Sequence, residues 1–176
     1  MQIYLDNAAT TKMRKRAIDA MLLYMDGVYG NPSSLHSAGQ AALEAMEDAR
    51  ARIAECIGAL SKEITFTSGG SEADNQAILS AVRMGERKGK RHIVSTAIEH
   101  HAVLHTLGRL QKEGYDVTLV DVGEDGIVRP SDVERAIRDD TCLVTVMYAN
   151  NEIGTIQPIK EIGALCRKKG VLFHTD

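Results

Sequence analysis

A glycine turn near residue 70 has the composition of a phosphate-binding loop. Gly69 and Gly70 let the backbone approach a ligand closely, and Ser71 supplies a hydroxyl group. An apolar run precedes the turn and a helical pattern follows it, so free N–H groups and the helix dipole would favour a phosphate. The alternative is a plain strand-to-helix turn with Ser71 as N-cap, and the segment alone favours neither interpretation. The turn lacks the residue spacing of a P-loop and the G-x-G-x-x-G spacing of a dinucleotide site. This disfavours ATP and NAD as its ligands.

Three polar side chains follow apolar runs that are typical of strands, namely His100, Asn151 and Asp176. In an open parallel sheet the ligand lies beyond the carboxyl ends of the strands, so we expect these residues to converge on the glycine turn. Pyridoxal 5'-phosphate (PLP) would use each of them. An aromatic ring stacks on the pyridine, an amide binds the phenolic oxygen, and a carboxylate keeps the ring nitrogen protonated, which makes the ring an electron sink.

Each of these residues also has a structural alternative. His100 could cap the following helix, Asn151 could form a turn, and Asp176 could be a solvated end. His101 and His105 lie four residues apart on a predicted helix and could share a metal, but no third ligand stands out, so a metal site is not predicted. The coincidence of the three polar residues with the glycine turn favours the functional interpretation.

The elements that must position these residues follow from the hydrophobic pattern. Short β-branched runs predict strands over 64–67, 92–95, 117–120, 142–146 and 171–174. Apolar spacings of three and four predict helices over 14–26, 37–57, 73–84, 102–110, 133–137 and 159–166. The alternation from residue 63 onward implies parallel strands joined by crossover helices on both faces. The predicted fold class is therefore α/β, a three-layer fold with a mostly parallel sheet flanked by helices.

Composition excludes several classes of protein. The chain has 176 residues and a net charge of -3 from 21 basic and 24 acidic side chains, without a basic stripe for nucleic acid. No apolar run approaches the ~20 residues that span a bilayer, and the start lacks a signal-peptide pattern, so a cytoplasmic protein is expected. Cys56, Cys142 and Cys166 form no CxxC pattern, and all three are expected to be buried apolar residues.

Five segments, which follow one another in a fixed order along the chain, carry recognisable motifs. They are residues 4–11 (YLDNAATT), 30–36 (GNPSSLH), 67–75 (TSGGSEADN), 99–103 (EHHAV) and 150–154 (NNEIG). In combination they resemble the cysteine desulfurases, in the NifS-like and IscS-like branch of the class V aminotransferases. The resemblance covers essentially the whole chain, and it implies the PLP-dependent transferase fold of type I.

The resemblance assigns the cofactor-binding residues one by one. Gly70 and Ser71 would bind the phosphate, with Ser71 at a position where the family commonly has threonine. His100 would stack on the pyridine and take part in proton transfer as a catalytic residue. Asn151 would bind the phenolic oxygen, and Asp176 would pair with the pyridinium nitrogen.

The reaction and the partners also follow from the resemblance. Asn7 and Ala8 would line the substrate side of the pocket. The family converts L-cysteine to L-alanine and keeps the sulfur as a persulfide on an enzyme cysteine. The sulfur then passes to an acceptor or an iron–sulfur scaffold protein. Family members are homodimers, so the same is implied for an intact parent.

The resemblance also implies a division of the chain. Residues 1–60 would form an N-terminal helical segment with an active-site loop, and residues 61–176 a partial PLP-binding large domain that stops before the Schiff-base lysine. The family's nucleophilic cysteine would lie beyond Asp176 as well, so the 176-residue piece alone is expected to be inactive. The alternatives are a selenocysteine lyase or another class V aminotransferase, a nucleotide-binding α/β module, and a non-catalytic remnant that acts only by binding.

Overall fold

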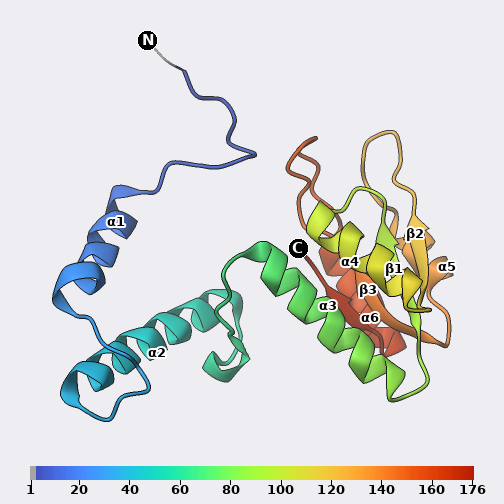
Figure 1. Cartoon of the computed structure of the whole chain (residues 1–176). Coiled ribbons are helices and arrows are strands. Elements are labelled where there is room, and N and C mark those ends of the chain that lie inside the picture. Colours follow the sequence, from blue (N-terminus) through green and yellow to red (C-terminus); the bar gives the residue numbers. More distant parts are fainter. Residues whose placement is uncertain (1–2) are drawn as a thin grey trace. The chain divides into compact units, whose positions relative to one another are not determined.

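The computed structural model describes residues 3–176, which divide into two compact units. The first unit ends at Phe66 and the second spans Thr67–Asp176. Figure 1 shows the course of the chain through both units. No helix among residues 3–176 is both long enough and apolar enough to cross a bilayer.

The N-terminal unit consists of two main helices. α1 spans Lys15–Leu22 and continues into a π-helical turn, Leu23–Gly27, and α2 spans Ser37–Ile57. The helices predicted over 14–26 and 37–57 are thereby confirmed. His36 caps α2, because its Nδ1 accepts a hydrogen bond from the Gly39 amide, and Gly58 ends the helix in the left-handed conformation.

The strand predicted over 64–67 is wrong. After a 3-10 turn, Ser61–Glu63, this segment is extended but pairs with no described strand. Arg50 of α2 holds it instead, since its guanidinium donates to the Ile64 carbonyl and lies 4.8 Å from the centre of the Phe66 ring. A β-branched sequence therefore stays extended without joining the sheet.

The second unit contains a four-stranded parallel sheet. The strands are β1 His92–Thr96, β2 Asp116–Val120, β3 Thr141–Thr145 and β4 Leu172–His174, in the order β2-β1-β3-β4. In the register of the sheet, Val94 lies opposite Thr118 on one side and Val144 on the other. The other predicted strands are confirmed within one or two residues at each end.

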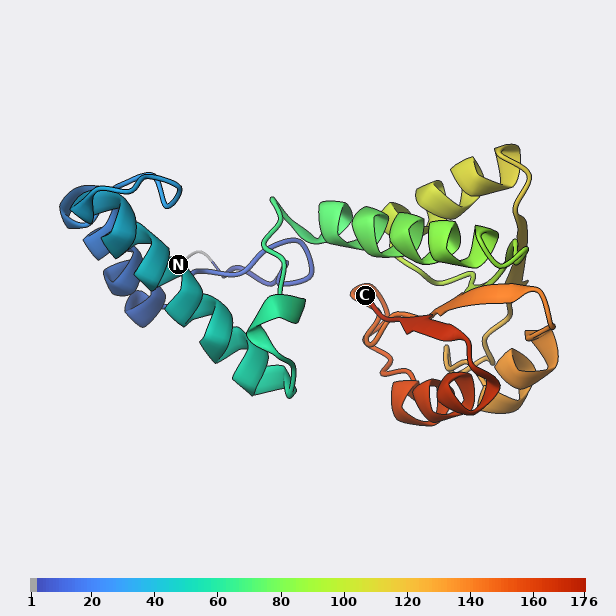
Figure 2. The same ribbon diagram turned by 90° about the horizontal axis from the view of Figure 1, so that it is seen from below.

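Helices cover both faces of this sheet, as Figure 2 shows. They are α3 Gly70–Glu86, α4 His101–Lys112, α5 Pro130–Ala136 and α6 Ile159–Lys169. α3 packs with α4, and α5 packs with α6. The first pair covers one face and the second pair the other, so the predicted three-layer α/β fold is confirmed.

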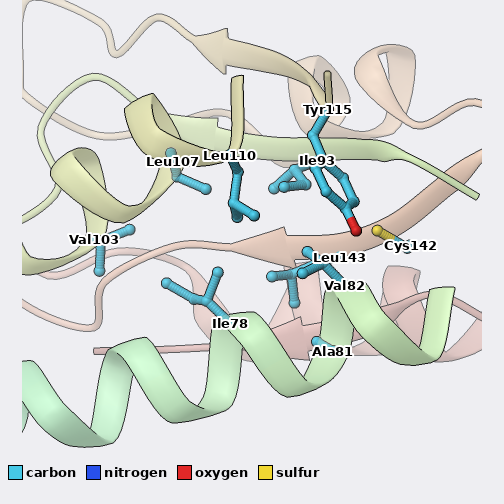
Figure 3. Close-up of a cluster of buried hydrophobic side chains, with 10 residues drawn as sticks. All are labelled: Ile78, Ala81, Val82, Ile93, Val103, Leu107, Leu110, Tyr115, Cys142 and Leu143. Carbon is cyan, nitrogen blue, oxygen red and sulfur yellow. The ribbon is translucent and has the colours of Figure 1, made fainter. Parts of the chain in front are cut away.

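Alternation along each strand separates two hydrophobic clusters. Ile93 and Leu143 point to the side of α3 and α4, whereas their neighbours Val94 and Val144 point to the side of α5 and α6. Figure 3 shows the first cluster, in which Ile78 and other apolar side chains of α3 face the sheet. Both faces of the central strands are buried, which explains their continuous apolar runs.

The cysteines differ in burial. Cys142 and Cys166 are buried in the second unit, as predicted, but Cys56 is exposed. The prediction for Cys56 is wrong because it lies two residues after Ala54, the buried hydrophobic residue of α2. Two helical residues turn the side chain by about 200°, so Cys56 faces away from the side on which Ala54 is buried.

Candidate active site

The glycine turn opens α3 without a side-chain cap. Gly69 is the N-cap residue, and its carbonyl accepts from the Ala73 amide at 3.1 Å, so Ser71 lies inside the first helical turn. The alternative in which Ser71 is the N-cap is therefore wrong. A Cβ added at Gly69 or Gly70 would have no atom within 4 Å, so this part of the backbone is open to a ligand.

The donors at this turn suit a phosphate. The first N–H groups of α3 have no acceptor within the helix, and the exposed Ser71 adds a hydroxyl beside them. Glu72 is occupied elsewhere, because one of its oxygens accepts from both the amide and the hydroxyl of Ser68 at 2.6 Å. These two hydrogen bonds lower the pKa of Glu72 below its ordinary value.

His100 begins α4. Its Nδ1 accepts a hydrogen bond from the Ala102 amide at 3.1 Å, so the capping role considered from the sequence is confirmed. The cap fixes the imidazole at one nitrogen, and the residue remains exposed. A ring held in this way at a helix start can still offer its face to a planar ligand.

The loop after β3 carries the asparagine pair. Asn150 is buried, and its side chain orders the turn, since its Oδ1 accepts from the amides of Glu152 and Ile153 at 2.8 and 2.9 Å. Asn151 lies in this turn and is exposed. The turn alternative for Asn151 is thus confirmed, and the same turn leaves its amide group accessible to a ligand.

Asp176 continues the line of β4. The Tyr148 amide donates to the Asp176 carbonyl at 2.7 Å, which extends the pairing with the β3 side beyond the end of the strand. His174 lies two residues earlier and on the same face. Its ring lies 3.5 Å from the Asp74 carboxylate and 2.8 Å from the Thr145 hydroxyl, so that face is the one covered by α3.

Two adjoining pockets join several of these residues. One is lined by residues that include Ser71, Asn75 and His100, and the other by residues that include His100 and Asn151. His100 therefore lies between the start of α3 and the loop after β3. The Thr106 hydroxyl of α4 donates to Asn75 Oδ1 at 2.7 Å, which ties the two helix starts together.

Two buried carboxyl groups lie at the same end of the sheet. Burial raises the pKa of Glu99 to about 7, and the charges of Asp176 and Asp74 add to this effect. Burial also raises the pKa of Asp74, as does the charge of Asp176, whereas His174 and His100 oppose the rise. Burial lowers the pKa of His174. Asp74 therefore interacts electrostatically with Asp176, His174 and His100, and Glu99 interacts with Asp74 and Asp176.

Sequence reasoning assigned no role to Asp74 or Glu99. Asp74 precedes the buried Ile78 by one helical turn, so its place on the apolar stripe of α3 could have predicted its burial. Nothing in the sequence marks Glu99 as buried, because it follows its strand in an irregular segment.

The remaining predicted residues belong to other parts of the chain. Asn7 and Ala8 are exposed residues of the N-terminal unit. Among residues 3–176, no group of histidine, cysteine and acidic side chains could hold a metal ion. His101 and His105 stack with ring centres 5.3 Å apart instead. Burial raises the pKa of the Cys142 thiol, and that of Cys166 to about 11, so both are poor nucleophiles.

The sheet defines an α/β protein, and the polar cluster lies at the carboxyl ends of its parallel strands, where ligands bind in open sheets of this kind. The chain belongs to the aminotransferase class-V family, whose family model matches residues 3–176. It is 51% identical over 175 residues to the putative cysteine desulfurase IscS 1 of Bacillus subtilis, and the match covers 99% of this chain and 46% of that protein.

Solved structures agree with this assignment. A NifS-like protein superposes with a TM-score of 0.94 at 40% identity, covering 100% of this chain and 49% of that one. SspA in complex with cysteine superposes with a TM-score of 0.92 at 40% identity, and the match covers 98% of this chain and 50% of that one. The chain thus spans about half the length of these relatives.

Proposed function

We propose that this chain supplies the cofactor-binding part of a PLP-dependent cysteine desulfurase, which converts L-cysteine to L-alanine and transfers the sulfur to an enzyme persulfide. The observation that carries the proposal is the meeting of the α3 start, His100 and the Asn151 turn around two adjoining pockets, with Asp176 at the same end of the sheet. The electrostatic interactions of Asp74 and Glu99 with Asp176 at that end support it further.

The donor set fits PLP. The backbone of Gly70 and the Ser71 hydroxyl would bind the phosphate, because the turn is open and carries free donors. His100 would lie against the ring, Asn151 would donate to the phenolic oxygen, and Asp176 would accept from the protonated ring nitrogen. When bound, PLP supplies an electron sink for the substrate carbons.

The electrostatics of the site support a protonated pyridine nitrogen. The side chain of Asp176 would attract the positive charge of that nitrogen, and Asp74 lies close enough to interact with Asp176. His174 links Asp74 to the end of β3 through Thr145, so the Asp74 carboxyl group is held at this end of the sheet. A protonated ring nitrogen is the form in which PLP withdraws electrons most strongly.

The substrate and the partners are proposed from the relatives. A structural neighbour is in complex with cysteine, which supports L-cysteine as substrate, and Asn7 and Ala8 are proposed to line its side of the pocket. We further propose that the intact protein is a homodimer in the cytoplasm. It would deliver sulfur to an acceptor protein or an iron–sulfur scaffold protein. Residues 1–60 and 61–176 are proposed as its two functional segments.

Cofactor binding is tested by titrating the 176-residue chain with PLP and following the cofactor's absorbance and fluorescence. Ser71→Ala should weaken binding about tenfold, because a hydrogen bond to a charged phosphate is lost. Ser80→Ala is the matched control, since Ser80 is an exposed serine of the same helix. Tight binding of ATP or NAD without binding of PLP would favour a nucleotide-binding module instead.

Activity is tested in a chimera that joins residues 1–176 to the C-terminal half of the Bacillus subtilis relative. With a dithiol reductant, this chimera should release alanine and sulfide from L-cysteine in equal amounts, and His100→Ala should abolish the release. A preference for L-selenocysteine would identify a selenocysteine lyase, and release of neither product would contradict both activities.

A further inference from the structure

We propose that Glu99 is a positioning residue, whose buried carboxyl group joins the loop that carries His100 to the loop that carries Asn151. This inference rests on the proposed function, because it takes His100 and Asn151 as the groups that hold the ring of PLP. Glu99 would touch neither the cofactor nor the substrate.

A single oxygen of Glu99 bridges two neighbouring strands. Glu99 is only 5% exposed, and its Oε1 accepts from the Thr96 hydroxyl at 2.6 Å and from the Met147 amide at 2.9 Å. Thr96 is the last residue of β1, and Met147 follows β3 by two residues. The carboxyl group therefore fixes the separation of the two strand ends at the point where both loops begin.

A second contact joins the same two loops. Asn150 Nδ2 donates to the Ile98 carbonyl at 2.9 Å, while Asn150 Oδ1 accepts from the amides of Glu152 and Ile153. Ile98 and His100 flank Glu99 in the chain, and Asn151 follows Asn150. The segment before His100 and the turn that contains Asn151 are thus connected twice, once through each side chain.

The second oxygen of Glu99 argues against a role of this residue in stability alone. Oε2 is buried and has no hydrogen-bond partner among the described residues, an arrangement that costs stability. The titratable groups that interact with Glu99 are Asp74 from α3 and Asp176 after β4, with His174 on β4 and the adjacent His100 at the same end of the sheet. A leucine of similar volume would avoid this cost but would release both loops.

Hydrogen exchange measured by mass spectrometry on the full 176-residue chain tests the connection without any cofactor. In Glu99→Leu, amides of residues 97–101 and 147–153 should exchange at least about tenfold faster, whereas residues 76–84 of α3 should keep their protection. Glu99→Gln should preserve protection in both loops, because its Oε1 still accepts both hydrogen bonds. Glu124→Gln, at an exposed position, is the control.

The outcomes separate a positioning role from general stabilisation. Unchanged exchange in both loops of Glu99→Leu, or faster exchange throughout the second unit, would overturn the proposal. If Glu99→Leu does not fold, Thr96→Val removes one of the two donors to Oε1. It should accelerate exchange in residues 97–101 and 147–153 in the same selective way, and uniform or absent acceleration would count against the proposal.

PLP titration of the same variants gives an independent readout. Glu99→Leu should bind PLP about tenfold more weakly, and Glu99→Gln should restore affinity to within about twofold of the parent chain. Equal affinity in all variants would overturn the positioning role and leave the cofactor site intact. Absence of PLP binding in the parent chain would instead refute the proposed function, while the exchange experiment would still decide whether Glu99 joins the loops.

Discussion

The Glu99 carboxyl group connects the stability of this protein to pH. Its raised pKa means that the folded state holds a proton over a range in which the unfolded chain releases it. Stability from this group is therefore fully present below the ordinary glutamate pKa and is lost as the pH rises through about 7. His92 and His174 act in the opposite direction, because burial lowers the pKa of each and folding then opposes their protonation.

A comparison of the parent chain with Glu99→Gln isolates the effect of Glu99. Between about pH 4 and about pH 8, the free energy of unfolding of the parent chain should fall by roughly 3 kcal/mol relative to that of the variant. Urea denaturation at a series of pH values measures this difference, in which the histidine effects largely cancel. A difference that stays constant across the range would show that Glu99 titrates normally in the folded protein.

Gly85 is a second residue whose environment permits little change. A Cβ at this position of α3 would lie 2.2 Å from the Cβ of Cys142 on β3, whereas a Cβ at Gly108 of α4 would meet no atom within 4 Å. Gly85→Ala should destabilise the protein by about 1–3 kcal/mol through overpacking. Gly108→Ala should stabilise it by about 0.5–1 kcal/mol through helix propensity. Chemical denaturation of both variants checks the pair, and equal effects would mean that α3 can move away from the sheet.

At the scale of elements, the start of α2 is fitted closely to the loop before it. Gln40 Nε2 donates to the Ser34 carbonyl at 3.1 Å, and the Ser34 amide donates to the Asn31 carbonyl at 2.9 Å. Gly39 makes this possible, since a Cβ there would lie 2.5 Å from the Ser34 oxygen and 2.7 Å from that of Asn31. The loop at residues 31–34 thus depends on a glycine, which has no side chain, in the first turn of the next helix.

Gly39→Ala should therefore displace the loop at residues 31–34 and weaken the first turn of α2. Hydrogen exchange of residues 31–40 measures the change, and we expect at least about tenfold faster exchange. Gly27→Ala provides a control in the same unit, because the nearest atom to its added Cβ is 3.9 Å away. Equal exchange in the two variants would show that the loop adapts to the added methyl group.

Periodicity predicted most elements because burial on both faces of the sheet leaves a strong pattern. It failed at residues 64–67, where a β-branched run is held by Arg50 rather than by a strand, a long-range contact that no local pattern encodes. The polar residues after β1, β3 and β4 were predictable, because topology alone brings strand ends together. The burial of Asp74 could have been predicted from its place on the apolar stripe of α3. The burial of Glu99 could not, since it depends on Met147, which lies beyond another strand.

At the scale of the whole molecule, the two units differ in how much apolar surface they bury. Both hydrophobic clusters lie in the second unit, whereas Ala54 is the one fully buried hydrophobic residue among residues 3–66. Leu35, by contrast, is 94% exposed. When it is separated from the rest of the chain, a segment of this length with so little burial cannot offset the loss of conformational entropy on folding.

Because both hydrophobic clusters lie in the second unit, this unit should fold alone. Residues 67–176, expressed separately, should unfold in one cooperative urea transition and keep the helical and strand signals of far-ultraviolet circular dichroism. Residues 1–66 should show no cooperative transition. A broad, non-cooperative transition for residues 67–176 would show that the sheet depends on the first unit.

The strand order β2-β1-β3-β4 also determines how the sheet can be assembled during synthesis. β1 emerges first, β2 adds to one side of it, β3 adds to the other side, and β4 adds outside β3. Each new strand joins an outer edge, and none has to be inserted between two strands that are already paired. The sheet can therefore grow in the order in which the ribosome releases the chain, with no earlier pairing to be broken.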